Sequence, residues 1–233
     1  MNKKLISMAT MLLSAFFLYA KPVSITFEFA DGERLVKEFD DTKETFVIWT
    51  GDSNDSVPSK ELTDIKGLEN WQVLEAVEFY GIKYYGDWRF LKDIKNLKGF
   101  FVNYFYCKSL RFLEDLVNLE DIELEVWINK KDSKDFEKEE IDLSKLSKIK
   151  TIALKAFYIS EDIHSDYRLT RIPNFINVQN HPVLDVNNNH IKELTKHDKK
   201  LLIQYSKVYF YSNPITADRD KLEEEFREIE FVW

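Results

Sequence analysis

The chain has 233 residues, of which 44% are hydrophobic, and a formal net charge of -8 at neutral pH. This acidity argues against nucleic acid or an anionic membrane surface as the main partner. With only six Gly and five Pro, the composition excludes a linker-rich or low-complexity chain and is consistent with one or two folded domains.

Residues 1–20 have the layout of a secretory signal peptide. Lys3 and Lys4 precede an apolar stretch from Leu5 to Leu18, and the small residue Ala20 ends the segment. The apolar stretch is short for a membrane span, which needs about 20 residues. We predict cleavage after Ala20 and export to the periplasm, the cell surface or the medium, with no stable membrane anchor after cleavage. An uncleaved N-terminal anchor is the alternative.

Residues 21–58 are predicted to form a β-rich unit. Apolar residues alternate from Val23 to Phe29 and end at Asp31-Gly32, which is a hairpin turn signal. The segment 35–39 should return as the second strand, and residues 45–50 should form a third. A polar loop then separates this unit from the rest of the chain.

Residues 59–215 carry a recurring apolar pattern. The frame L-x-x-L-x-L-x-x-N/C-x-L fits six segments whose starts are 22 to 32 residues apart. The six starts are Leu74, Leu97, Leu119, Ile149, His181 and Tyr205, so a histidine stands at one position that is normally apolar. Between segments the apolar residues recur at every third position, as in Leu91, Ile94 and Leu97.

The pattern resembles that of leucine-rich repeat proteins, and most closely the short-repeat, internalin-like type found on bacterial surfaces. The resemblance covers residues 62–215 and is clearest in the last two segments. It implies an α/β fold, namely a leucine-rich repeat solenoid with a curved parallel sheet and about six coils. Because the ends of a solenoid expose its core, residues 21–58 are expected to be an N-terminal β cap and residues 216–233 a C-terminal helical cap.

The last two segments have Asn189 and Asn213 at the polar position of the frame. In the family this side chain lies inside the solenoid, where its amide bonds backbone groups as the chain turns away from the strand. The neighbours Asn187 and Asn188 are expected only to flank it. Large apolar residues occupy the corresponding position of the first four segments, namely Ile82, Phe105, Trp127 and Phe157. The turns there must be closed in another way.

Two insertions interrupt the segments, and a helix is expected near the end of the chain. The charged residues 128–140 are predicted to form a solvated loop, with a charged docking tip as the alternative. Residues 160–182 contain Leu169, Ile172 and Phe175 and should pack over the convex side. Leu222 and Phe226 have helical spacing in residues 216–229, and the final four residues are expected to add a short strand.

No motif in the sequence indicates catalysis or a cofactor. A glycine-rich phosphate loop, a G-x-S-x-G elbow and an H-E-x-x-H pair are all lacking. The four histidines do not have the spacing of a metal site, and Cys107 is alone and expected to be buried. We therefore expect a protein that is not an enzyme and that uses no metal or cofactor, with a hydrolase built from scattered carboxylates as a minor alternative.

The remaining candidate is a surface. Alternate side chains of a strand face opposite sides, so the residues between the apolar positions should line the concave face. This face is predicted to bind a protein or peptide partner, because aromatic residues are enriched at interface anchors and its acids favour a basic partner. The predicted binding residues are Glu78, Tyr80, Phe101, Asn103, Glu123, Glu125, Asp185, Asn187, Tyr209 and Tyr211. A structural or assembly component of the bacterial cell envelope, without a discrete ligand site, is the alternative function.

Overall fold

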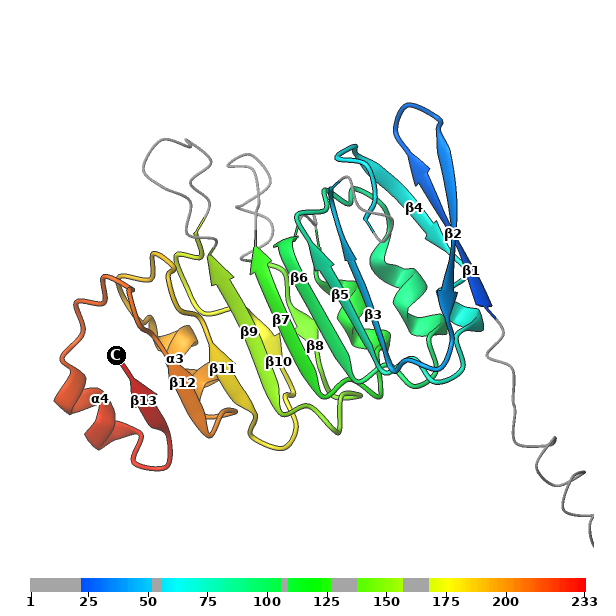
Figure 1. Cartoon of the computed structure of the whole chain (residues 1–233). Helices are drawn as coiled ribbons and strands as arrows, with labels where there is room; N and C mark the ends of the chain where they lie inside the picture. Colours follow the sequence, from blue (N-terminus) through cyan, green and yellow to red (C-terminus); the bar gives the residue numbers. More distant parts are fainter. Residues whose placement is uncertain (1–21, 52–55, 106–108, 127–137, 157–167) are drawn as a thin grey trace, which may run out of the picture.

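Eight parallel strands lie side by side along the molecule (Figure 1). The computed structural model describes residues 22–51, 56–105, 109–126, 138–156 and 168–233. The strands of this large sheet, in spatial order, are β13 (Glu230–Val232), β12 (Lys207–Tyr209), β11 (Val183–Asp185), β9 (Thr151–Ala156), β7 (Asp121–Val126), β6 (Gly99–Phe105), β5 (Ala76–Tyr80) and β3 (Thr45–Trp49). The predicted α/β class with a large parallel sheet is confirmed.

The alternating apolar residues of these strands all point to one side. Ile122 and Leu124 of β7 are fully buried, and Glu123 between them is partly exposed. The register places Ile122 opposite Phe100 on one side and Ile152 on the other. Because side chains alternate along a strand, this register stacks the apolar residues of neighbouring strands into a continuous core.

The chain returns behind the sheet through short turns rather than long helices. Three 3-10 helices, η1 (Leu68–Asn70), η2 (Trp88–Asp93) and η3 (Arg111–Asp115), precede β5, β6 and β7 respectively. Successive turns close through Ile94 N to Leu91 O and Leu97 N to Ile94 O, at 3.1 and 3.2 Å. Residues three apart in such turns lie on the same side, which explains the spacing of three in the sequence. The α-helix α3 (Lys196–Leu202) also lies behind the sheet (Figure 1).

The N-terminal hairpin belongs to a second, three-stranded sheet. β1 (Pro22–Phe29) pairs antiparallel with β2 (Arg34–Asp40), as predicted, and also with β4 (Leu62–Lys66). In contrast, β3 pairs in parallel with β5 of the large sheet. The chain therefore enters the large sheet at residue 45 and returns to the small sheet at residue 62, on either side of the boundary predicted at residues 58 and 59.

The C-terminal residues form the helix and the strand that the sequence indicates. α4 (Arg219–Glu225) is capped by Asp218, whose side chain accepts from the Lys221 N–H, and it buries Leu222. β13 then pairs in parallel with β12. A further two-stranded sheet joins β8 (Ile141–Asp142) to β10 (Phe175–Ile176), and the predicted apolar residues Leu169, Ile172 and Phe175 are buried.

Asn189 and Asn213 make backbone bonds of the kind that the repeat resemblance implies. The Asn189 amide donates to Leu154 O at 2.8 Å and Val186 O at 3.0 Å, and its oxygen accepts from Leu169 N at 2.9 Å. The Asn213 amide donates to Val186 O at 2.8 Å and Phe210 O at 3.1 Å, and its oxygen accepts from Ile191 N at 3.0 Å. Each side chain therefore ties the turn after its own strand to the preceding strand of the sheet. His181, in contrast, is exposed, and the adjacent Pro182 is buried.

Several predicted features lie outside the described residues. These are the signal segment 1–20, Cys107, most of the charged insertion 128–140, and residues 160–167 of the second insertion. Within the part of the chain that the structure describes, none of the helices has the length and apolar character needed to cross a membrane.

Candidate functional site

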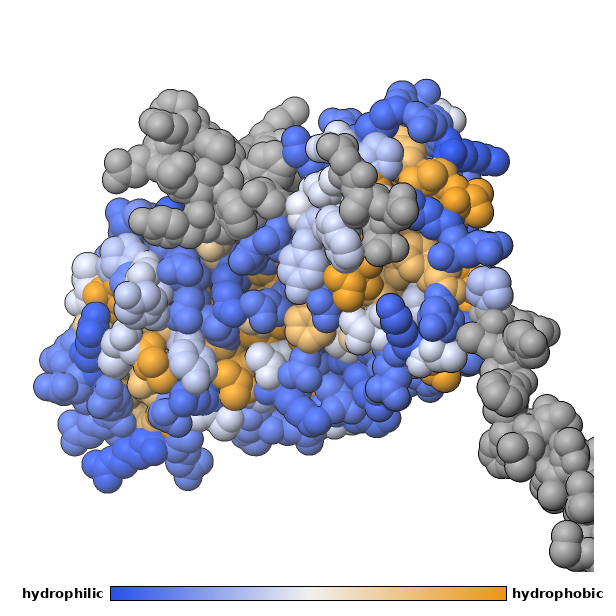
Figure 2. All heavy atoms as spheres, in the orientation of Figure 1, coloured by the Kyte–Doolittle hydropathy of each residue, from blue (hydrophilic) through white to orange (hydrophobic). Residues whose placement is uncertain are grey.

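The side of the large sheet away from the 3-10 helices is called the open face here. Its side chains form two rows across the strands, and these rows contain all ten residues predicted from the sequence. The first row is Val47, Glu78, Phe101, Glu123, Ala153, Asp185 and Tyr209, which pair in register from β3 to β12. The second row lies two residues further along the chain in each case, just past the ends of β11 and β12, and is Trp49, Tyr80, Asn103, Glu125, Lys155, Asn187 and Tyr211. In Figure 2, which views this side, hydrophobic patches interrupt a mainly hydrophilic surface.

The open face contains two residues that the sequence reasoning missed. Val47 and Trp49 of β3 pair with Glu78 and Tyr80 of β5, and Trp49 is exposed. They were missed because residues 45–50 were assigned to the N-terminal unit. The signal was present, since the alternation of buried Phe46 and Ile48 with these two residues matches the pattern of the later strands.

The N-terminal end of the open face is aromatic. Tyr80 is 43% exposed, and its hydroxyl donates to the Glu78 carboxylate at 2.9 Å. The ring of Phe101 lies over Gly99, where an added Cβ would lie only 2.6 Å from Phe101 Cε2. The absence of a side chain at Gly99 therefore lets the Phe101 ring lie against the sheet, which leaves it half-buried.

The C-terminal end of the open face presents two tyrosines. Lys207 Nζ lies 4.9 Å from the ring centroid of Tyr209 and 2.7 Å from the Glu230 carboxylate. Tyr211 is 62% exposed, the largest exposure among the large hydrophobic residues of the described chain. Tyr209 is thus held by a neighbouring cation, whereas Tyr211 projects into solvent.

A single lysine organises the centre of the open face. Lys155 Nζ lies 2.8 Å from a Glu123 oxygen and 3.4 Å from an Asp185 oxygen. These two acids flank Ala153 in the first row, so the lysine side chain crosses Ala153, which is only 2% exposed. Burial by itself lowers the pKa of Lys155, but the bond to Glu123 and the charge of Asp185 outweigh it and raise the pKa above its usual value.

Two polar oxygens beside Lys155 have no hydrogen-bond partner among the described residues. They are Oε2 of Glu125 and Oδ1 of Asn187, and both atoms are buried. Burial raises the pKa of Glu125, and the charge of Glu123 raises it further, with Lys155 opposing. Asn103, on the other side of Glu125, is engaged instead with the Gly81 N–H at 3.4 Å.

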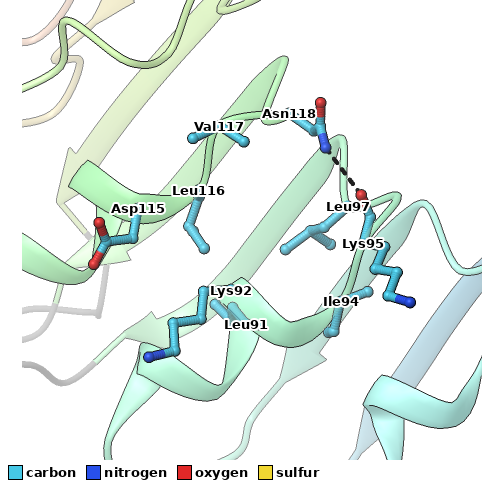
Figure 3. A pocket seen from close by; sticks show the side chains of 9 residues that line it. All are labelled: Leu91, Lys92, Ile94, Lys95, Leu97, Asp115, Leu116, Val117 and Asn118. Carbon is cyan, nitrogen blue, oxygen red and sulfur yellow. Dashed lines mark hydrogen bonds between the residues drawn. The ribbon is translucent and has the colours of Figure 1, made fainter.

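A crevice on the opposite side of the molecule is a weaker candidate (Figure 3). It lies between the turns at residues 91–97 and 115–118, and most of its apolar lining, including Leu91 and Leu116, belongs to the core. Asn118 Nδ2 donates to Lys95 O at 2.9 Å, which ties the two turns together, as Figure 3 shows. The crevice is therefore a seam between adjacent turns.

Within the described ranges, no three or more His, Cys, Asp or Glu side chains are grouped so that they could hold a metal ion. The comparisons with known proteins add no candidate activity. No protein-family model matches the chain, and no curated protein matches it either. The open face is consequently assessed on its own geometry.

Proposed function

We propose that the chain is an exported leucine-rich repeat protein whose open face binds a protein or peptide partner. The observation that carries the proposal is the in-register array of outward side chains across the large sheet, with acids in its middle and exposed aromatic residues toward both ends. Tyr80 and Tyr211 provide apolar area that no described element covers, and aromatic residues of this kind dominate binding energy at interfaces.

The leucine-rich repeat interpretation is supported by two local features. The turns after β11 and β12 are each closed by an asparagine with the same set of backbone bonds. The apolar residues of neighbouring strands also pair in register, as stacked coils require. The first four segments lack the asparagine, and 3-10 helices lead into the strands of the first three of them, β5, β6 and β7.

The two ends of the sheet are proposed to be capped. At the N-terminal end, the small sheet buries Ile25 and Phe27 in the same core as Phe46 of β3. At the other end, Phe226 packs edge-on against Phe231 of β13, with ring centroids 6.3 Å apart. Export is proposed from the composition of residues 1–20. No catalytic step is assigned.

Co-purification from envelope and medium fractions, followed by kinetic measurements, tests the proposed function. Tyr80→Ala with Tyr211→Ala should speed dissociation of the retained partner at least tenfold, because the rings provide burial. Ile203→Ala is the matched control, since Ile203 is 59% exposed beyond α3 on the other side of the sheet. Unchanged dissociation in the double variant, or an equal effect in the control, would falsify open-face binding and favour a structural role in the cell envelope.

A further inference from the structure

The middle of the open face is short of positive charge. The outward residues of β7, β9 and β11 include four carboxylates and one ammonium group. The acids are Asp121, Glu123, Glu125 and Asp185, and the cation is Lys155. Lys155 Nζ is committed to Glu123 at 2.8 Å and to Asp185 at 3.4 Å, so the positive charge present is already shared between two acids.

Glu125 is the acid left without a donor at one of its oxygens. The register places Lys155 directly opposite Glu125, yet the lysine reaches into the first row instead. Oε2 of Glu125 is buried and has no hydrogen-bond partner in the described chain, and the same holds for Oδ1 of Asn187 on the other side of Lys155. Buried acceptors without donors cost free energy and are rare in folded proteins, so the two oxygens call for a donor from outside the chain.

An exposed aromatic ring lies in the same row as Glu125, two strands away on β5. Burial raises the pKa of the Tyr80 hydroxyl, the bond to Glu78 raises it further, and the charges of Glu123 and Glu125 add to this effect. The Tyr80 hydroxyl therefore lies within electrostatic reach of both carboxylates while its ring stays exposed. A planar guanidinium suits a carboxylate with an unpartnered oxygen, because it can donate two parallel N–H bonds to it. The exposed Tyr80 ring can pack against the rest of the partner segment.

We propose that the partner inserts an arginine side chain that donates to the Glu125 carboxylate, while the exposed Tyr80 ring packs against another residue of the same partner segment. Glu125 and Asn187 lie two strands apart, which is about 10 Å, so one guanidinium does not reach both oxygens. Asn187 Oδ1 then accepts an N–H from the backbone of the same partner segment. The excess of acid over base on these strands attracts such a basic segment. This inference rests on the proposed function and specifies its partner.

The first test titrates the purified protein, carrying ¹³C-labelled glutamate carboxyls, with N-acetyl-arginine amide. The Glu125 carboxyl signal should shift more than those of the other glutamates, and the probe should lower the Glu125 pKa. N-acetyl-citrulline amide, which has a similar shape without the charge, should cause no such shift. An unmoved Glu125 signal, or an equal response to citrulline, would overturn the proposal.

The second test uses variants of the protein with the arginine probe and the recovered partner. Glu125→Gln should weaken partner binding about tenfold, the usual effect of removing one charged hydrogen bond. Asp121→Asn is the control, because it removes one charge from the same strand and the same face. Equal losses of partner affinity in the two variants would mean that the overall negative charge of the face causes the effect, and would overturn the arginine site.

The two proposals fail in different ways. Loss of partner binding in the Tyr80 and Tyr211 double variant, with normal binding by Glu125→Gln, overturns the arginine site and leaves the proposed function intact. Normal binding by both variants overturns the proposed function as well.

Discussion

Lys155 forms its closest ion pair with Glu123, 2.8 Å away, although the strand register places it opposite Glu125. This diagonal pairing is possible because Ala153, between Glu123 and Asp185 in the first row, is small enough for the lysine chain to cross it. The arrangement satisfies two acids with one cation and leaves Glu125 to another donor.

Lys155→Met should destabilise the fold by about 1 kcal/mol, the upper end for partly exposed ion pairs, because Glu123 and Asp185 lose their shared cation. Lys145→Met is the matched control, since Lys145 and Asp115 form a well-exposed pair at 3.1 Å. That variant should lose less than about 0.5 kcal/mol. Urea denaturation at low and high salt measures both losses of unfolding free energy. Equal losses would show that the Lys155 ion pairs stabilise the fold no more than an exposed surface pair does.

Glu125→Gln should change how stability depends on pH. Burial raises the folded-state pKa of Glu125, with Glu123 adding to the effect, so the folded state holds this proton more tightly than the unfolded chain does. Stability then falls as pH rises from the ordinary glutamate range through the raised pKa. The Gln variant lacks this fall in stability. Its free energy of unfolding should therefore match that of the native protein in acid and exceed it at neutral pH. Denaturation midpoints across pH check this, and a gain that is constant with pH would contradict it.

Asn189→Leu and Asn213→Leu should each cost about 1 to 3 kcal/mol, because backbone groups lose their partners inside the fold. Asn189 should cost more, since it is 1% exposed, whereas Asn213 is only partly buried. The control is Asn188→Gly, because Asn188 has φ 61° and an alanine there would add backbone strain. Thermal and urea denaturation should show the glycine variant close to the native protein. A loss at Asn188 as large as that at Asn189 would contradict the assigned role.

Gly67→Ala should be more damaging than Gly32→Ala. Both glycines have positive φ, 105° and 84°, so each alanine carries the left-handed penalty of about 1 to 2 kcal/mol. At Gly67 the new Cβ would also lie 2.3 Å from the Ser24 carbonyl oxygen, whereas at Gly32 nothing lies within 4 Å. The difference between the two losses of unfolding free energy measures the steric clash in the Gly67 variant, and so how closely the backbone before η1 approaches β1. Equal losses would mean that this contact is readily relieved.

Much of the open face could be predicted from the sequence because strand alternation is a local property. The positions of Phe101, Glu123 and Tyr209 follow from the apolar residues on either side of each, and the observed register places them in one row. The same reasoning failed at Trp49 because the sheet that a strand joins depends on distant partners. Residues 45–50 follow a hairpin in the sequence, yet β3 pairs with β5.

The sequence by itself determined which residues of each strand face the core, since this follows from spacing along the chain. Its resemblance to leucine-rich repeats indicated which asparagines close the turns. The tertiary structure alone decided how the charges of the open face are shared. Lys155 could have paired with Glu125 directly across from it, with Glu123, or with Asp185, and nothing in the local sequence separates these choices. The choice depends on the space above Ala153 and on the burial of Glu125, which exist only after three strands have been brought together.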